Sequence, residues 1–341
     1  MDNAVQPTPL TDGHNDLPWA IRLAGGLDEV DLLATPFQTD VPRLRESGVR
    51  AQFWSVFVPS GRDARKEGID DPFLTTCEQI DIVHRMAARW PQHLRIATTA
   101  RAISDAAELG TATDAPIASL LGAEGGHCIS NSLSALRTLH RLGVRYLTLT
   151  HNDNNDWADS ATDRPQHGGL TDFGRDVVRE MNRLGMMVDL SHTAPTTMQD
   201  ALDVSTAPVI FSHSSARAVT DHPRNVPDHI LEQMAAGGGT CMVAFVTKFV
   251  KRRLRRHSNI DDVVRHINHV RDVAGVDHVG IGGDFDGTTQ LPRGLEDVSG
   301  YRALFAALAD AGWSRDDLAK LGWRNIARTF SLVEDASEFG A

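Results

Sequence analysis

His14 and Asp16 carry side chains that bind metal ions, and their spacing would bring both to one ion. They lie two residues apart in Gly-His-Asn-Asp, and residues i and i+2 of a strand point to the same face. Glu124, in Gly-Ala-Glu-Gly-Gly-His, adds a carboxylate beside glycines that let a metal approach the backbone closely. Its two oxygens could bridge two ions. These three residues therefore form one candidate set of metal ligands.

His192 and His213 form a second candidate pair. They end the segments Val-Asp-Leu-Ser-His and Val-Ile-Phe-Ser-His, and the interval of 21 residues (213 − 192) is about one strand-helix unit. Neighbouring strands lie roughly 4.7–4.9 Å apart, so both rings could reach one ion at about 2.0–2.1 Å. Alternatively, the two histidines could be ordinary buried residues that form hydrogen bonds. This alternative is less favoured because other candidate metal ligands occur in the same sequence.

The five residues can be divided between two ions that share one carboxylate. One ion would take His14, Asp16 and Glu124, and the other would take Glu124, His192 and His213. Each ion would then have three protein ligands and an open position, which is typical of catalytic rather than structural zinc. Two ions about 3.5–4 Å apart can share a water and lower its pKa toward 7, producing a hydroxide nucleophile. The pattern predicts a hydrolytic centre.

The elements that must position these residues are short apolar runs alternating with helical segments. The runs begin near residues 9, 49, 117, 144, 186, 208, 240 and 278. Apolar strands alternating with helices indicate an α/β protein with a parallel sheet, and eight units predict a (β/α)8 TIM-like barrel in a single domain over residues 1–341. An open doubly wound sheet is the alternative, but its glycine-rich nucleotide turn is replaced here by His-Asn-Asp. A strand at Leu94–Ala97 is expected outside the barrel. Helical periodicity is clearest in Thr76–Trp90, Leu133–Leu142, Asp172–Leu184, Asp228–Ala236 and Asp261–Ala274.

Ionisable residues close most of the predicted strands. Seven of them stand at six strand ends: His14, Asp16, Glu124, His151, His192, His213 and Asp284. The active site of a (β/α)8 barrel is built at the carboxyl ends of its strands. Buried ionisable groups cost several kcal/mol unless they are paired or metal-bound. We therefore expect the metal site at this end of the barrel.

The amino-acid composition limits the kinds of binding partner and the cellular compartment that we expect. The chain has 34 Lys and Arg against 45 Asp and Glu (34 − 45 = −11) and three widely spaced cysteines. The negative charge argues against nucleic acid, and the basic run at 251–256 is expected to be a solvated connection. The odd cysteine count favours a reducing compartment. With neither a signal peptide nor an apolar run of about 18 residues, we expect a cytoplasmic protein without a membrane anchor.

Longer segments of the chain are similar to those of one known family. They are Asp-Gly-His-Asn-Asp-Leu-Pro-Trp and Glu-Gly-Gly-His, then 145–152, 182–192, 207–216, 224–228 and 282–287. With these segments the sequence resembles the membrane (renal) dipeptidases, peptidase family M19, within the amidohydrolase superfamily. The animal members are secreted, lipid-anchored, disulfide-bonded and glycosylated. Because this chain lacks those signals, their location is not carried over.

The resemblance implies roles for individual residues. Two zinc ions would be bound by His14, Asp16, Glu124, His192 and His213, with Glu124 bridging. His151 and Arg224 would bind the substrate, and Asp284 would transfer a proton or hold the substrate's α-ammonium group. A donor such as His151 suits the oxyanion of peptide hydrolysis, and the planar guanidinium of Arg224 suits a dipeptide's free carboxylate.

The implied enzyme is a homodimeric binuclear zinc dipeptidase. It would hydrolyse L-Xaa-Xaa dipeptides, with L-L substrates expected and L-D substrates left open, by means of a metal-bridging hydroxide. Two alternatives remain. The first is another amide hydrolase of the amidohydrolase barrels, acting on N-acyl-amino acids or β-lactams. The second is a non-catalytic barrel that binds metal or peptide.

Overall fold

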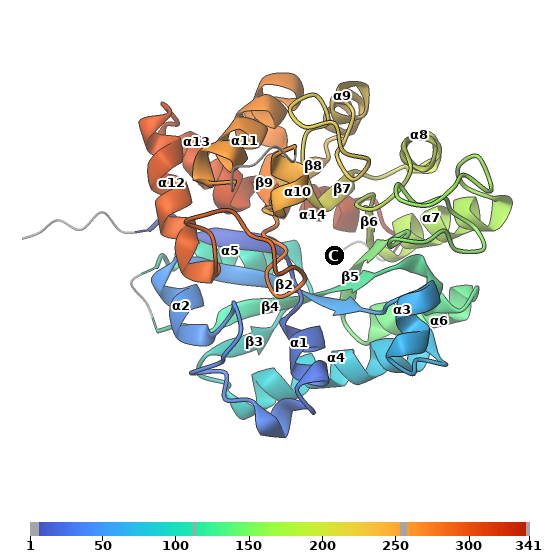
Figure 1. The fold of residues 1–341 in the computed structure, drawn as a ribbon, viewed down its shortest axis with the longest axis horizontal. Coiled ribbons are helices and arrows are strands. Elements are labelled where there is room, and N and C mark those ends of the chain that lie inside the picture. Colours follow the sequence, from blue (N-terminus) through green and yellow to red (C-terminus); the bar gives the residue numbers. More distant parts are fainter. Residues whose placement is uncertain (1–6, 112–113, 253–257, 339–341) are drawn as a thin grey trace, which may run out of the picture.

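The computed structural model describes residues 7–111, 114–252 and 258–338, and its centre is a closed barrel of parallel strands (Figure 1). Each barrel strand pairs in parallel with the next, and the last pairs with the first. The eight strands are β1 (Leu10–Asn15), β2 (Val49–Phe57), β4 (Ile117–Glu124), β5 (Val144–Thr148), β6 (Met187–Asp189), β7 (Val209–Ser214), β8 (Thr240–Val243) and β9 (Val279–Ile281). The predicted (β/α)8 architecture is confirmed.

A ninth strand, β3 (Leu94–Ile96), lies outside the barrel, as predicted. It pairs with the first residues of β4, Ile117 to Ser119. From Leu121 onward, β4 pairs with β5 instead. Since β2 pairs with β4 along 118–124, β3 extends one edge of β4 without entering the closed ring.

The helices cover the outside of the barrel, and those with the clearest periodicity form close to where the sequence predicts them. They are α4 (Pro72–Arg89), α6 (Leu133–Arg141), α7 (Asp172–Leu184), α9 (Asp228–Ala236) and α11 (Ile260–Ala274). Side chains cap several of them: Thr171 accepts from the backbone N–H of Gly174 at the start of α7, and Gly185 ends this helix in a left-handed turn. The other helices are α1 (Leu17–Leu23), α2 (Val41–Glu46), α3 (Gly61–Lys66), α5 (Ala100–Glu108), α8 (Pro195–Val204), α10 (Thr247–Val250), α12 (Tyr301–Asp310), α13 (Arg315–Ala319) and α14 (Asn325–Asp335).

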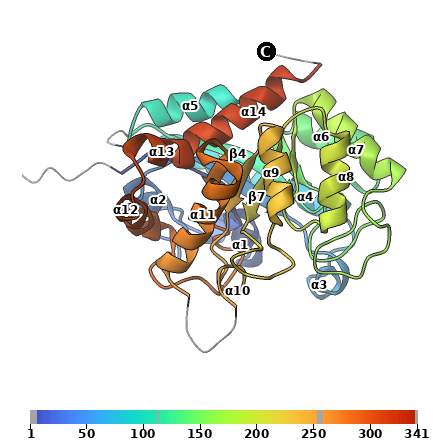
Figure 2. The same ribbon diagram turned by 90° about the horizontal axis from the view of Figure 1, so that it is seen from above.

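Apolar packing closes the end of the barrel where the strands begin. Inward-facing side chains such as Phe53, Leu120 and Ile210 belong to one buried cluster with Ile326 and Phe330 of α14. Helix α14 packs against α5, and Figure 2 shows the two side by side. Because this end is filled, a ligand can approach the barrel interior only from the end where the strands finish.

Two further sequence predictions concern the surface. Lys251, in the predicted basic connection, forms an ion pair with Asp262 at 2.9 Å, while residues 253–256 of the run lie outside the described residues. Within the described ranges, no helix has both the length and the apolar character needed to cross a membrane.

Candidate metal centre

Three of the predicted ligands belong to the barrel strands themselves. His14 lies in β1, Glu124 is the last residue of β4, and His213 lies in β7. Asp16 follows β1 directly and precedes α1. All four therefore reach the open end of the barrel.

The strands β5, β6 and β9 end earlier than the sequence predicts. His151, His192 and Asp284 each lie three residues beyond the end of their strand, and so they lie in loops rather than at strand ends. His192 (φ 68°) and Asp284 (φ 61°) adopt left-handed backbone conformations, which cannot continue a β-ladder. Such conformations are uncommon for residues other than glycine and tend to occur at functional sites. They turn both side chains back over the barrel.

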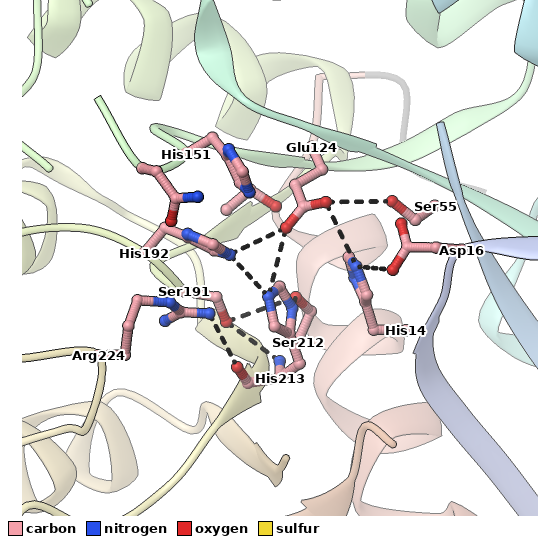
Figure 3. Close-up of polar contacts among 12 residues, drawn as sticks. His14, Asp16, Ser55, Glu124, His151, Ser191, His192, Ser212, His213 and Arg224 are labelled. Atoms are coloured by element: carbon pink, nitrogen blue, oxygen red, sulfur yellow. Dashed lines mark hydrogen bonds and ion pairs between the residues drawn. The ribbon is translucent and has the colours of Figure 1, made fainter. Parts of the chain in front are cut away.

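The other four candidate ligands gather around Glu124 (Figure 3). Its Oε1 atom lies 3.0 Å from Nε2 of His192 and 3.3 Å from Nε2 of His213. Its Oε2 atom lies 3.5 Å from Nε2 of His14, and that nitrogen is 3.4 Å from Oδ2 of Asp16. Each carboxylate oxygen thus faces one of the two ligand sets that the sequence predicts.

Several buried atoms of this cluster lack the hydrogen bonds that burial normally requires. Among the described residues, Nε2 of His14 and Oδ1 of Asp16 have no hydrogen-bond partner. The Nε2 atoms of His192 and His213 are only 3.0 Å apart. Unpaired buried polar atoms are costly, and a divalent cation between the nitrogens and carboxylates would satisfy them together. The side chains present therefore fit metal ions.

The electrostatics of the cluster favour the protonation states that metal ligands need. Burial lowers the pKa values of His192 and His213 well below the usual range of imidazole, which keeps both rings neutral at neutral pH. Burial alone would raise the pKa of Glu124, but the facing His14 and the hydrogen bonds from the imidazoles hold it well below its usual value. Burial lowers the pKa of His14, but the facing Tyr146, Glu124 and Asp16 outweigh burial and raise it well above its usual value. The cluster thus offers a carboxylate anion and two neutral imidazoles, while His14 would give up a proton on binding a metal.

A cavity of about 300 Å³ opens over the cluster. Trp19, Phe57 and Phe249 form apolar parts of its wall, and Arg224 and Asp284 line it with polar groups. A concave site with apolar walls and a few convergent polar groups suits a small polar ligand.

Arg224 is a buried cation without an anionic partner among the described residues. Its side chain is 2% exposed. Among the described residues, its guanidinium makes two long hydrogen bonds, at 3.5 Å to Oγ of Ser214 and 3.4 Å to the carbonyl oxygen of His213. Burial lowers its pKa to about 10, which still leaves it charged at neutral pH. The guanidinium can therefore bind an anionic group of a ligand in the cavity.

His151 and Asp284 both line the cavity, His151 beside His192 and Asp284 beside Asp16. The ring of His151 lies 4.4 Å from that of His192, centroid to centroid, and burial lowers its pKa to about 4, so that it is a neutral N–H donor. Burial and the nearby Asp16 carboxylate raise the pKa of Asp284 to about 8. Its carboxylate oxygens lie close to His14 and Asp16. Both side chains are thus within the cavity that also holds Arg224.

Two hydroxyl groups contact the histidine ligands and were not identified from the sequence. The Tyr146 hydroxyl lies 2.9 Å from Nδ1 of His14, and the Ser212 hydroxyl lies 2.8 Å from Nδ1 of His213. The position of Ser212 directly before His213 was visible in the sequence, but only the closed barrel shows that Tyr146 meets His14 from another strand.

Removing metal is expected to destabilise the fold. Ions that bind only the folded state add about 2.7 kcal/mol to the free energy of unfolding when free metal is about 100-fold above its Kd. Thermal unfolding in excess chelator, compared with zinc-replete protein, should therefore give a lower Tm in chelator, with Mg²⁺ as the control ion. Identical Tm values in both conditions would contradict a metal centre within the fold.

None of the three cysteines forms a disulfide, and two are expected to be unreactive. Burial raises the pKa of Cys128 to about 12 and raises that of Cys241 further, so neither thiol ionises at neutral pH. A thiol-specific chromogenic reagent should modify at most the half-buried Cys77 in native protein and all three after unfolding. Fast modification of Cys128 in native protein would contradict this prediction.

Comparison with known proteins identifies similar chains across nearly the whole length. The family model described as membrane dipeptidase (peptidase family M19) matches residues 2–339. A relative in Schizosaccharomyces pombe, named an uncharacterized dipeptidase, is 45% identical over 338 residues, which cover 96% of this chain and 81% of that protein.

Solved structures show the same similarity in three dimensions. A metallo peptidase from Rhodobacter sphaeroides, solved with a phosphinate mimic of the dipeptide L-Ala-D-Ala, is 27% identical and superimposes with a TM-score of 0.83. The alignment covers 96% of this chain and all of that one. The dipeptidase AC, a metallo peptidase of family M19, is 28% identical with a TM-score of 0.82, over 98% of this chain and 100% of its own.

Proposed function

The chain belongs to the membrane dipeptidase family, peptidase family M19, and from that membership we propose that it is a binuclear zinc dipeptidase acting on L-Xaa-Xaa dipeptides. The observation that supports this most is the position of Glu124 between two ligand sets, one facing each carboxylate oxygen. The solved relative bound to a mimic of L-Ala-D-Ala supports including L-D dipeptides among the substrates.

His14, Asp16 and Glu124 would hold one ion, and Glu124, His192 and His213 would hold the other. When bound, such ions lower the pKa of water toward neutrality and polarise the carbonyl of the scissile bond. Neutral His192 and His213 and the ionised Glu124 would supply lone pairs without first losing protons at neutral pH, whereas His14, whose pKa is raised well above its usual value, would lose one. We propose zinc because imidazole and carboxylate ligands with an open position are typical of its catalytic sites.

The remaining cavity residues would bind and orient the dipeptide. The planar guanidinium of Arg224 would donate hydrogen bonds to the substrate's carboxylate. This guanidinium is buried and lacks an anionic partner among the described residues. His151 would donate its N–H to the oxygen of the scissile carbonyl as negative charge develops there. If Arg224 binds the carboxylate of the residue directly after the scissile bond, dipeptides would be preferred over longer chains.

Asp284 would transfer the proton between the attacking water and the leaving amine. It lines the cavity on the side of Asp16, and without bound ions its pKa of about 8 leaves it largely protonated at neutral pH. Bound cations would lower that pKa, and the carboxylate could then accept a proton from the attacking water and deliver it to the leaving amine. The same carboxylate could instead hold the substrate's α-ammonium group. An asparagine at this position would keep the second contact as a hydrogen bond but would remove the proton acceptor.

A dipeptide library tests the proposal. Zinc-replete protein should hydrolyse free L-L dipeptides, with L-D isomers compared in parallel, and should leave tripeptides intact. N-acyl-amino acids and a β-lactam should be assayed in parallel, because hydrolysis of such amides is the alternative function. Hydrolysis of the N-acyl-amino acids or the β-lactam alone would refute the dipeptidase assignment. So would a protein that binds two ions but hydrolyses none of the substrates.

The proposal also covers the oligomeric state and the cellular location of the protein. Homodimer formation is proposed from the family resemblance and can be tested by light scattering of the purified protein. A reducing, cytoplasmic location is proposed because all three cysteines are free thiols.

A further inference from the structure

Two histidine ligands are held by hydroxyl groups on the side that faces away from the metal cluster. His14 and His213 both turn Nε2 toward Glu124 and Nδ1 toward a buried hydroxyl (Figure 3 shows the His213 side). A neutral imidazole carries one proton, and the nitrogen without it is the one that can bind a metal. The hydrogen-bonding state of each hydroxyl therefore decides which nitrogen is available.

The surroundings of Tyr146 determine where its proton lies. Its hydroxyl oxygen is 2.9 Å from Nδ1 of His14 and 3.1 Å from the carbonyl oxygen of Gly13. A carbonyl oxygen can only accept, so the Tyr146 hydroxyl must donate to Gly13 if both contacts are hydrogen bonds. Nδ1 of His14 must then be the donor to Tyr146. This places a proton on Nδ1 of His14, so that Nε2 is the nitrogen that can present a lone pair to a metal.

Ser212 is constrained in the same way by a carboxylate. Its hydroxyl donates to Oδ2 of Asp189 at 2.6 Å and contacts Nδ1 of His213 at 2.8 Å. Asp189 is fully buried, and its Oδ1 accepts the backbone N–H groups of Ser191 (3.1 Å) and Ser212 (2.8 Å). Since the serine proton points to Asp189, Nδ1 of His213 must donate to the serine oxygen. Nε2 of His213 is therefore left unprotonated.

The barrel interior is shaped to let Tyr146 reach His14. Tyr146 belongs to β5, and its ring spans the interior to β1 on the other side of β4 and β2. A Cβ atom at Gly122 of β4 would lie 1.9 Å from Cζ of the Tyr146 ring. Any larger residue at position 122 would therefore displace the ring. Both Tyr146 and Ser212 are fully buried, so solvent does not compete for their hydrogen bonds.

We infer that Tyr146 and Ser212 are positioning residues that hold His14 and His213 in the Nδ1–H tautomer, so that Nε2 of each is the metal ligand. The Tyr146 hydroxyl contacts a ligand of the first set, His14, and the Ser212 hydroxyl contacts a ligand of the second set, His213. His192 differs, because its Nδ1 has no hydrogen-bond partner among the described residues. The inference rests on the proposed metal centre but does not depend on which substrate the enzyme hydrolyses.

Zinc titration of metal-free protein against a competing chromogenic chelator tests the inference without measuring activity. Tyr146→Phe should weaken binding of one ion, and Ser212→Ala should weaken binding of the other. Loss of such supporting contacts typically costs about 10- to 100-fold in metal affinity. The double variant should weaken both ions.

Two matched controls remove equally buried hydroxyls that touch no imidazole. Tyr301→Phe deletes a hydroxyl that donates to Oδ2 of Asp12 at 2.7 Å, and Ser215→Ala deletes one that donates to the carbonyl oxygen of Ala244 at 3.2 Å. Both control variants should keep the wild-type zinc affinities. Equal weakening in the controls would show a general effect of buried hydroxyl loss and would overturn the inference.

The wild-type protein provides a measurement that does not depend on how the variants fold. Long-range ¹H–¹⁵N spectra of the imidazole nitrogens in zinc-loaded protein should show the retained proton of His14 and His213 on Nδ1. Protons on Nε2, or unchanged zinc affinity in both variants while the wild type binds two ions, would overturn the inference alone. A wild-type protein that binds no zinc would overturn the metal centre as well.

Discussion

Glutamine in place of Glu124 is expected to abolish dipeptide hydrolysis and to release at least one of two bound ions. The carboxylate has one oxygen facing His192 and His213 and the other facing His14. An amide keeps the shape but retains only one oxygen, so it cannot bridge two ions. Metal ions contribute several kcal/mol to such reactions, and kcat/KM should therefore fall by about 10³-fold or more.

Metal content and kinetics should be measured on the same samples, with elemental analysis after gel filtration. Glu334→Gln is the matched control, since Glu334 accepts from the backbone N–H of Ala100 at 3.2 Å at the closed end of the barrel. The control should keep both ions and full activity. A Glu124→Gln protein with two tightly bound ions would show that this carboxylate is not the bridge.

Methionine in place of Arg224 is expected to cut dipeptide turnover sharply while leaving the metal content intact. The guanidinium is buried beside the cavity, makes only long hydrogen bonds at 3.4 and 3.5 Å, and lies 5.1 Å from the centre of the Phe249 ring. Truncating one partner of a buried charge pair costs about 2–5 kcal/mol, which corresponds to a loss of about 30- to 5,000-fold in kcat/KM. Lysine at this position should restore part of the loss, because it keeps the charge but not the planar pair of donors.

A substrate without a free carboxylate distinguishes loss of carboxylate binding from general damage to the enzyme. Wild-type enzyme should hydrolyse a dipeptide amide about as slowly as the Arg224→Met variant hydrolyses the free dipeptide, and the variant should no longer distinguish the two. Arg328→Met, at the closed end where Arg328 donates to the carbonyl oxygen of Gly238 at 2.9 Å, is the control and should keep wild-type kcat/KM. A variant that still prefers the free carboxylate would exclude Arg224 as its binding group.

The order of the barrel strands and the main helices could be predicted because each has a strong local pattern. Strands buried on both faces are almost continuously apolar, and helix α7 forms over the predicted range because its N-cap Thr171 and its terminal Gly185 are both local signals. The resemblance to family M19 is confirmed by the family model over residues 2–339. The single-domain assignment and the roles of individual site residues remain predictions.

The sequence could not show where β6 and β9 end or which side chains support the ligands. His192 and Asp284 continue apolar runs, and nothing in the periodicity marks their left-handed backbone. Tyr146 also has no local signal, because its contact with His14 joins residues 132 positions apart. The need for glycine at position 122 becomes clear only when the ring of Tyr146 is placed inside the closed barrel.

Anomalous diffraction at the zinc edge, from crystals grown with excess zinc, tests the two-metal centre most directly. The proposed two-metal centre predicts two peaks about 3.5–4 Å apart. One peak should lie beside His14 and Asp16, the other beside His192 and His213, with Glu124 between them. A single peak, or peaks away from Glu124, would contradict the two-metal centre.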